Sequence, residues 1–144
     1  MVVTLKIFHI LVAAAWFGHK LLIPRDMRDS IRHIGEGTEL FIGRIKRAER
    51  LGQVAGLLTV ASGLGLIYLV WGFADAPVRI YLGLGAALAM FVIGAALARP
   101  AWNRIEAGLT EGDATTAAAS EPQLRRALLL ENLLWVLALG AMVT

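Results

Sequence analysis

Two stretches decide the fold: Leu51–Phe73, LGQVAGLLTVASGLGLIYLVWGF, and Ile80–Ala98, IYLGLGAALAMFVIGAALA. Neither contains an Asp, Glu, Lys, Arg or His residue. Crossing the ~30 Å hydrocarbon core of a bilayer takes roughly 20 apolar residues in a helix, and both stretches are long enough. The alternative is a soluble bundle, but a helix of a soluble protein keeps a polar face, which these two lack. Both stretches therefore predict transmembrane helices.

Two further apolar stretches, Val2–Ile23 and Ala127–Val143, flank this pair. Over all 144 residues, 58% are hydrophobic and 17% charged, against about 45–50% and ~25% in soluble domains. Backbone polar groups inside lipid must bond to one another, so each stretch must be helical. The sequence thus predicts an all-α membrane protein, an antiparallel four-transmembrane-helix bundle forming a single membrane domain over residues 1–144.

The first stretch has a second interpretation, as a cleaved signal peptide. Ala13 and Ala15 form a small-x-small cleavage pattern. The apolar run continues past them to Ile23, however, and Lys6 and His9 interrupt what should be a purely apolar region. We therefore expect a retained helix.

Basic residues are concentrated in two connections, 24–50 and 99–126, which predicts the orientation. They are Arg25, Arg28, Arg32, Arg44, Lys46, Arg47 and Arg50 in the first, and Arg99, Arg104, Arg125 and Arg126 in the second. Lys and Arg in short loops mark the cytoplasmic side. We expect a multi-pass protein of the plasma (inner) membrane with both termini outside. The lipid bilayer is its expected partner, and the net charge of +3 is no sign of a nucleic-acid partner.

The two connections differ in character. Apolar residues at helical spacing in 24–50, interrupted at Gly35 and Gly37, predict that the first two transmembrane helices extend into the cytoplasm as a hairpin. Residues 106–121 are rich in Ala, Thr, Gly and acids without a period, which favours a mobile linker. The last helix is then expected to begin at Pro122. The chain has no cysteine, which excludes disulfides and thiolate metal sites.

Polar side chains within the first apolar stretch are candidates for function, because they are costly in lipid. At ~100° per residue, Lys6, His9, Ala13, Trp16 and Lys20 share one face, which we expect to point into the bundle. A neutral imidazole at His9 suits a metal ion or a haem iron. The structural alternative is a histidine hydrogen-bonded to a neighbouring helix.

Glu131 is the single acid within the four apolar stretches. A carboxylate at that depth is either protonated or paired with a cation. The cations expected at its depth are Lys20, Arg25 and Arg50, and we favour a buried pair with Lys20. Such a pair either fixes the helices or forms part of a path for protons or substrate.

These residues resemble a known family. The stretch LKIFHI at Leu5–Ile10, followed by Trp16-Phe17-Gly18 and Pro24-Arg25, looks like the first helix of the HemJ-type protoporphyrinogen oxidases and the related CopD-like membrane proteins. Ala48-Glu49-Arg50-Leu51 is similar to the start of the family's second helix. Glu131-Asn132 resembles a pair in its last helix, in reversed order.

The resemblance implies a four-helix membrane fold that binds b-type haem through the first-helix histidine and oxidises a porphyrinogen. Carried over, it implies His9 as the ligand of the haem iron, with Lys6, Trp16 and Arg25 as its companions in cofactor binding. The sequence departs from the family at the start of the third helix, where Val78–Tyr81 lacks the family's histidine and lysine. Met90 lies about a turn too deep to be a second axial ligand.

Two functions remain open at this point. The first is a haem- or porphyrin-binding redox protein that uses His9. The second is a small-solute or metal-ion permease, or an accessory membrane subunit without enzymatic activity, in which the polar stripe and Glu131 form a path. The sequence leaves open the substrate, any enzymatic activity and the oligomeric state, a homo-oligomer included.

Overall fold

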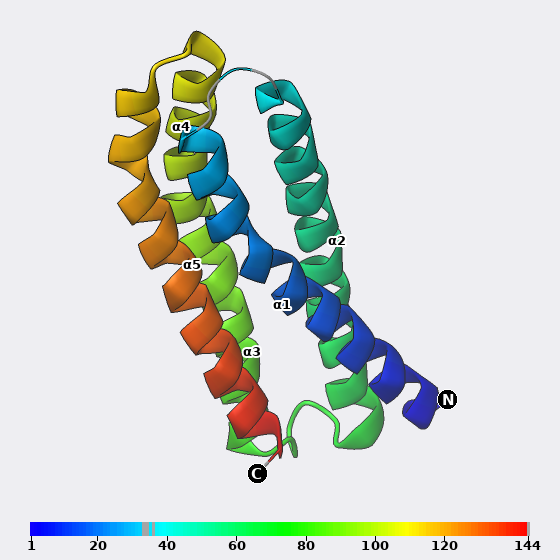
Figure 1. Ribbon diagram of the computed structural model, residues 1–144. Helices are drawn as coiled ribbons and strands as arrows, with labels where there is room; N and C mark the ends of the chain where they lie inside the picture. Colours follow the sequence, from blue (N-terminus) through cyan, green and yellow to red (C-terminus); the bar gives the residue numbers. More distant parts are fainter. Residues whose placement is uncertain (33–34, 36, 144) are drawn as a thin grey trace.

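In the computed structural model the chain forms long helices connected by short turns (Figure 1). The structure describes residues 1–32, 35 and 37–143, without the side chains of residues 22, 25, 26, 29, 30 and 32. The helices are α1 (Val2–Arg32), α2 (Thr38–Val70), α3 (Val78–Ile93), α4 (Arg99–Glu111) and α5 (Ala114–Val143). A π-helical turn, η1 (Gly94–Ala98), joins α3 to α4, so that the three form one continuous rod.

Four helical segments are long and apolar enough to cross a membrane: Val2–Leu21, Thr38–Val70, Val78–Glu111 and Ala114–Val143. Their outward faces carry large apolar side chains that are more than half exposed, among them Ile10, Leu57, Leu82 and Leu137. Such surfaces are stable against lipid chains and not against water. The chain is therefore an all-α, multi-pass membrane protein, as the sequence predicted.

The helices pack as two hairpins. α1 lies against α2, and the rod of α3, η1 and α4 lies against α5, whereas contacts between the two pairs are much sparser. Both termini and the turn between α2 and α3 lie at one end of the molecule, called the terminal end below (Figure 1). The opposite end holds the connections from α1 to α2 and from α4 to α5.

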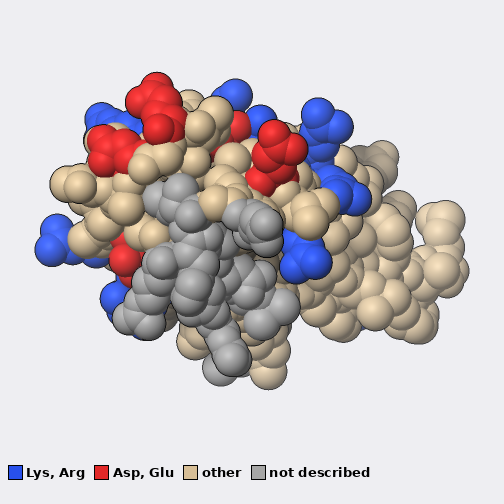
Figure 2. Space-filling view, turned by 45° about the horizontal axis from the view of Figure 1, so that its top comes forward, with Lys and Arg blue, Asp and Glu red and all other residues tan. Residues whose placement is uncertain are grey.

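The end opposite the termini is built like a soluble helical bundle. Its core contains Met27 of α1, Phe41 of α2, Ile105 of α4 and Leu124 of α5, all at most 8% exposed. Ion pairs surround this core, with Lys46 Nζ 2.6 Å from Glu106 Oε1. Figure 2 shows charged side chains of both signs gathered over one part of the surface, while the rest of the visible face carries almost none.

This region confirms one sequence prediction and corrects another. α1 and α2 extend well past their apolar stretches, and the chain turns near Gly35 and Gly37, whose φ angles are +139° and +97°. Residues 106–121, by contrast, are not a linker. They are helical except for a tight turn at Gly112 and Asp113, and α5 begins at Ala114, eight residues before Pro122.

The linker prediction was wrong because these helices are stabilised by capping and by the packing of small residues, neither of which requires an apolar period. Gly112 ends α4 in the left-handed conformation at φ +74°, which glycine adopts without strain. Asp113 Oδ1 then accepts the backbone N–H groups of Thr115, at 2.9 Å, and Thr116, at 3.1 Å, and so caps α5. Small Ala117 is fully buried against α4 close to Gly108. Alanine, a strong helix former, needs no amphipathic pattern here.

Candidate functional site

The rings of α1 pack into glycine positions on α2, and this register positions the candidate site. In three places the Cβ of an alanine would contact or clash with a ring of α1, which shows how closely each ring approaches. The pairs are His9 on Gly63, Trp16 on Gly56 and His19 on Gly52. The two helices are antiparallel, so these pairs follow one another along a single seam. His9 and Trp16 of the polar stripe therefore face α2, whereas Lys6 is exposed and Lys20 pairs with Glu131 of α5.

His9 is hydrogen-bonded to the neighbouring helix α2 in this seam, the arrangement expected under the structural alternative. Its Nδ1 lies 2.9 Å from Ser62 Oγ. The Ser62 hydroxyl can donate its proton to the carbonyl of Leu58, at 2.6 Å, or of Thr59, at 3.1 Å, and it then accepts from His9. In this arrangement Nδ1 carries the proton and Nε2 keeps a lone pair. Histidines that bind metals are oriented by a hydrogen bond of this kind from the other ring nitrogen.

A cavity of about 410 Å³, called the His9 cavity below, lies between the two hairpins towards the terminal end. Its walls are almost entirely apolar, with Ile67 and Ala87 on opposite sides and Trp71 and Met142 near the termini. The polar groups at this cavity include Lys6, His9 and Thr59. Apolar cavities of ~300–1,000 Å³ with a few convergent polar groups are typical of ligand and cofactor sites.

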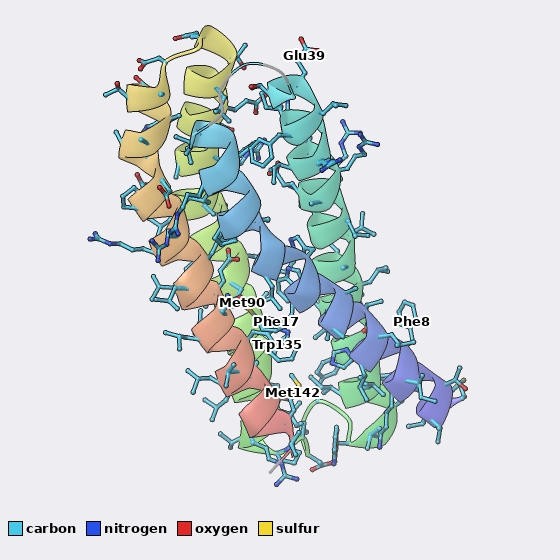
Figure 3. The ribbon with its side chains drawn as sticks, viewed as in Figure 1. Phe8, Phe17, Glu39, Met90, Trp135 and Met142 are labelled. Carbon is cyan, nitrogen blue, oxygen red and sulfur yellow. The ribbon has the colours of Figure 1, made fainter. Side chains whose placement is uncertain are left out.

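Met90 lies deeper along the bundle and lines the His9 cavity as well. It is 3% exposed. Figure 3 places Met90, Phe17 and Trp135 together in the middle of the molecule, where the Phe17 and Trp135 rings stack at 4.2 Å. Met90 lines this cavity at the level of Trp16, two helical turns of α1 from His9.

A second cavity of about 420 Å³, called the Glu131 cavity below, lies on the other side of Trp16. Trp16 and Met90 line both cavities and separate them. The Trp16 ring is 5% exposed and packs against Phe91 at a centroid distance of 5.1 Å. Trp16 thus lines the cavity of His9 and also forms a wall of the second cavity.

Lys20 and Glu131 form a buried ion pair in the Glu131 cavity. The side chains are 11% and 4% exposed, and Lys20 Nζ also lies 5.2 Å from the centre of the Trp16 ring. A lysine in that position is stabilised by the carboxylate and by the negative face of the indole. The pair joins α1 to α5 and so connects the two hairpins, as expected from depth along the helices.

The π turn η1 faces this ion pair. The Arg99 N–H donates to the carbonyl of Gly94, five residues back, and the next residue is Pro100. Proline has no N–H and its ring clashes with the carbonyl four residues earlier, so a wider turn just before it relieves the clash. A Cβ at Gly94 would lie 3.1 Å from Glu131 Oε1. The glycine thus makes room for the carboxylate, which sequence reasoning had not anticipated.

The remaining predicted residues lie in different surroundings. Lys6 is exposed at the rim of the His9 cavity. Arg25 belongs to α1, but its side chain lies outside the described residues. Trp102 is buried, at 6% exposure, against Phe41. Arg50 is exposed, and Glu131 pairs with Lys20.

His19 also belongs to this site. Its ring lies on Gly52 of α2 and lines the Glu131 cavity. Its Nδ1 has no well-oriented hydrogen-bond partner, with the carbonyls of Ala15 and Trp16 the nearby acceptors. The spacing of Trp16 and His19 against Gly56 and Gly52 was the available signal.

Among the residues that the structure describes, no three His, Asp or Glu side chains form a group that could hold a metal ion by themselves. A metal bound at His9 would therefore need other ligands, such as those of a porphyrin ring. Comparisons with protein-family models, with curated proteins and with solved structures each gave no match.

Proposed function

We propose that this chain is a membrane redox protein that binds haem or a related porphyrin in the His9 cavity, with His9 as an axial ligand. The observation that carries the proposal is the hydrogen bond from His9 Nδ1 to Ser62. It leaves Nε2 as the nitrogen that can bind iron, in an otherwise apolar space between two hairpins.

The chemistry of the walls fits a flat apolar ring that carries acid groups. The cavity is bounded mainly by Ala, Ile, Leu, Val and aromatic side chains, which suit a macrocycle. Lys6 at its rim offers a cation to a carboxylate.

A bound haem would supply one-electron chemistry, and the residues of the chain would control its surroundings. Ser62 holds the orientation of His9, while the apolar walls exclude water. Low polarity around a redox centre shifts its potential, because a charge that develops there is poorly solvated. The Trp16 wall separates this space from the charged Glu131 cavity.

The proposed location is the plasma (inner) membrane, with both termini outside. The support is the distribution of Lys and Arg, which gather on the connections opposite the termini. In this orientation the His9 cavity opens towards the outer half of the membrane.

The test is the absorption spectrum of protein purified in detergent from haem-replete cells. Wild type is expected to show a Soret band, and His9→Ala is expected to lose it. His19→Ala is the matched control, since it removes a histidine of the same helix that lines the other cavity. A colourless wild type, or equal bands in wild type and His9→Ala, contradicts the proposal.

A small-solute or ion permease is the second candidate, and the adjoining cavities favour it. Together they run along the interface of the two hairpins from Lys6 to Arg99, divided by Trp16 and Met90. If this path conducts, Glu131→Gln changes proton or ion flux into proteoliposomes without any change in absorbance. Unchanged flux in Glu131→Gln and in Trp16→Ala rules out the path.

A further inference from the structure

The Glu131 cavity is lined by charged side chains, and only two of them pair with each other. Four charged side chains line it: Lys20, Glu49, Arg99 and Glu131. Lys20 and Glu131 pair with each other. In the described part of the chain, Arg99 has no ion pair or side-chain hydrogen bond, and the one side-chain partner of Glu49 is Gln53, at a long 3.5 Å. One anion and one cation thus remain available to a ligand.

These two charges come from opposite hairpins. Glu49 belongs to α2, and Arg99 is the first residue of α4. The helices are already joined once, by the ion pair of Lys46 and Glu106. Glu49 lies about one turn deeper than Lys46 on α2, and Arg99 about two turns deeper than Glu106 on α4. Among the described residues neither Glu49 nor Arg99 forms an ion pair, and both line the cavity, which lies between the two helices.

The wall beyond the charges is aromatic and apolar. Trp16, Phe91 and Trp102 line it from three helices, together with Ile23 and Leu128. A ligand that fits this space has a head with both charges and an apolar remainder. A ligand with both charges can contact both side chains, whereas a simple anion or a simple cation leaves one of them without a partner.

We propose that the Glu131 cavity is a second binding site, for a zwitterionic amphiphile whose ammonium group contacts Glu49 and whose carboxylate or phosphate contacts Arg99. Charge-assisted hydrogen bonds at each end give affinity and fix the orientation of the head. The apolar part packs against Trp16, Phe91 and Trp102. Two kinds of molecule carry an ammonium group, an anionic group and an apolar part: an ethanolamine phospholipid from the surrounding leaflet, and a free amino acid with an apolar side chain.

This inference does not rest on the proposed function. It concerns the charged cavity and not the His9 cavity, and it needs no haem. Binding here is measured by mass and by thermal stability, whereas haem binding is measured by absorbance, so either proposal can fail alone.

The lipid arm of the test is native mass spectrometry of the full chain in detergent. The protein is incubated with equal amounts of phosphatidylethanolamine, phosphatidylglycerol and phosphatidylcholine. Preferential retention of phosphatidylethanolamine is expected, because phosphatidylglycerol lacks the cation and the trimethylammonium group of phosphatidylcholine has no N–H to donate. The solute arm measures the unfolding temperature with L-leucine and asks whether L-leucine displaces the lipid.

Glu49→Gln and Arg99→Gln are each expected to weaken the retained ligand by about 10-fold or more, the usual effect of losing a hydrogen bond to a charged group. Glu39→Gln and Arg126→Gln are the controls, since both residues are exposed and neither lines the cavity. Figure 3 shows Glu39 at the far end of α2. The controls are expected to bind as wild type does.

The exchanged variant Glu49→Arg with Arg99→Glu guards against misfolding as the cause of lost binding. It keeps one charge of each sign on the cavity, and recovery of binding in it supports the proposal. Selective retention of phosphatidylethanolamine assigns the ligand to the lipid, and competition by L-leucine assigns it to a free solute. Equal retention of all three lipids without an effect of L-leucine, or wild-type binding in Glu49→Gln, overturns the proposal.

Discussion

The hydroxyl of Ser62 determines which nitrogen of His9 is available to a ligand. Ser62 Oγ donates to its own helix and therefore accepts from His9 Nδ1. A Ser62→Ala variant loses this acceptor, and the imidazole is freer to rotate and to change tautomer. We expect haem affinity to fall by about 10- to 100-fold, as for other partners of metal-binding histidines.

A haem titration of apoprotein measures the effect of Ser62→Ala. Thr110→Val is the matched control, because the Thr110 hydroxyl likewise donates to a carbonyl of its own helix, that of Glu106 at 2.8 Å, and Thr110 does not line the His9 cavity. Equal dissociation constants in Ser62→Ala and wild type would show that the hydrogen bond has no part in binding.

The buried ion pair predicts an asymmetric response to mutation. Glu131→Gln leaves the Lys20 ammonium buried without a counter-charge, a change that typically costs about 3–5 kcal/mol. Lys20→Met together with Glu131→Gln removes both charges, and most of the lost stability should return. Thermal unfolding in detergent measures the series. Glu106→Gln, which opens the exposed pair with Lys46, should cost no more than about 1 kcal/mol. A Glu131→Gln variant as stable as Glu106→Gln would contradict this account.

At the scale of elements, the seam between α1 and α2 depends on glycines that accept rings. A Cβ at Gly56 would lie 2.8 Å from Phe91 Cζ and 2.9 Å from Trp16 Cε2. Gly56→Ala should therefore destabilise the protein by about 1–3 kcal/mol through overpacking. Gly18→Ala adds the same methyl group where nothing lies within 4 Å, and it should be neutral or stabilising. Equal melting temperatures for the two variants would disprove the close fit of the seam.

The cap of α5 makes a prediction about pH. The Thr116 hydroxyl, the backbone N–H of Thr116 and that of Thr115 all donate to Asp113 and hold its pKa below the ordinary value of 3.8. Because the folded-state pKa is depressed, the cap is fully present above pH 3.8 and is lost as the pH falls through the lower folded value.

Amide exchange of Thr115 and Thr116, followed by NMR, tests the cap. Protection of these amides should decrease as the pH falls below 3.8, after correction for intrinsic exchange, whereas Asp113→Ala should be unprotected throughout. Protection that is independent of the Asp113 charge would show that the cap does not order this end of α5.

The elements also show how far the sequence could lead. Four apolar stretches predicted the helices because lipid allows an isolated segment no other structure. The two helices that meet within residues 106–121 depend on local capping at the turn between them. The π turn before Pro100 depends on the ring of that proline. Neither feature produces an apolar period in the sequence. The pairing of Lys20 with Glu131 could be predicted from the depth of the two residues along their helices. The packing of His19 on Gly52 could not, because it depends on the register between α1 and α2.

At the scale of the whole molecule, the basic connections predict orientation. The chain has no native cysteine, so single cysteines report position without background. Ala74→Cys lies in the turn between α2 and α3, and Glu111→Cys lies at the opposite end. A membrane-impermeant maleimide should label Ala74→Cys in intact cells, and Glu111→Cys only after permeabilisation. The reverse pattern would place the termini inside.

In the proposed function, His9 Nε2 would hold the iron of a porphyrin in the His9 cavity. The most direct measurement is haem binding by His9→Gly, with and without added imidazole, followed by absorbance. Wild type should bind haem with a Soret band characteristic of axial histidine, and His9→Gly should not. Millimolar imidazole should restore the band to His9→Gly, because it fills the space that the side chain leaves. An identical spectrum and affinity in wild type and His9→Gly, with no response to imidazole, would contradict the claim.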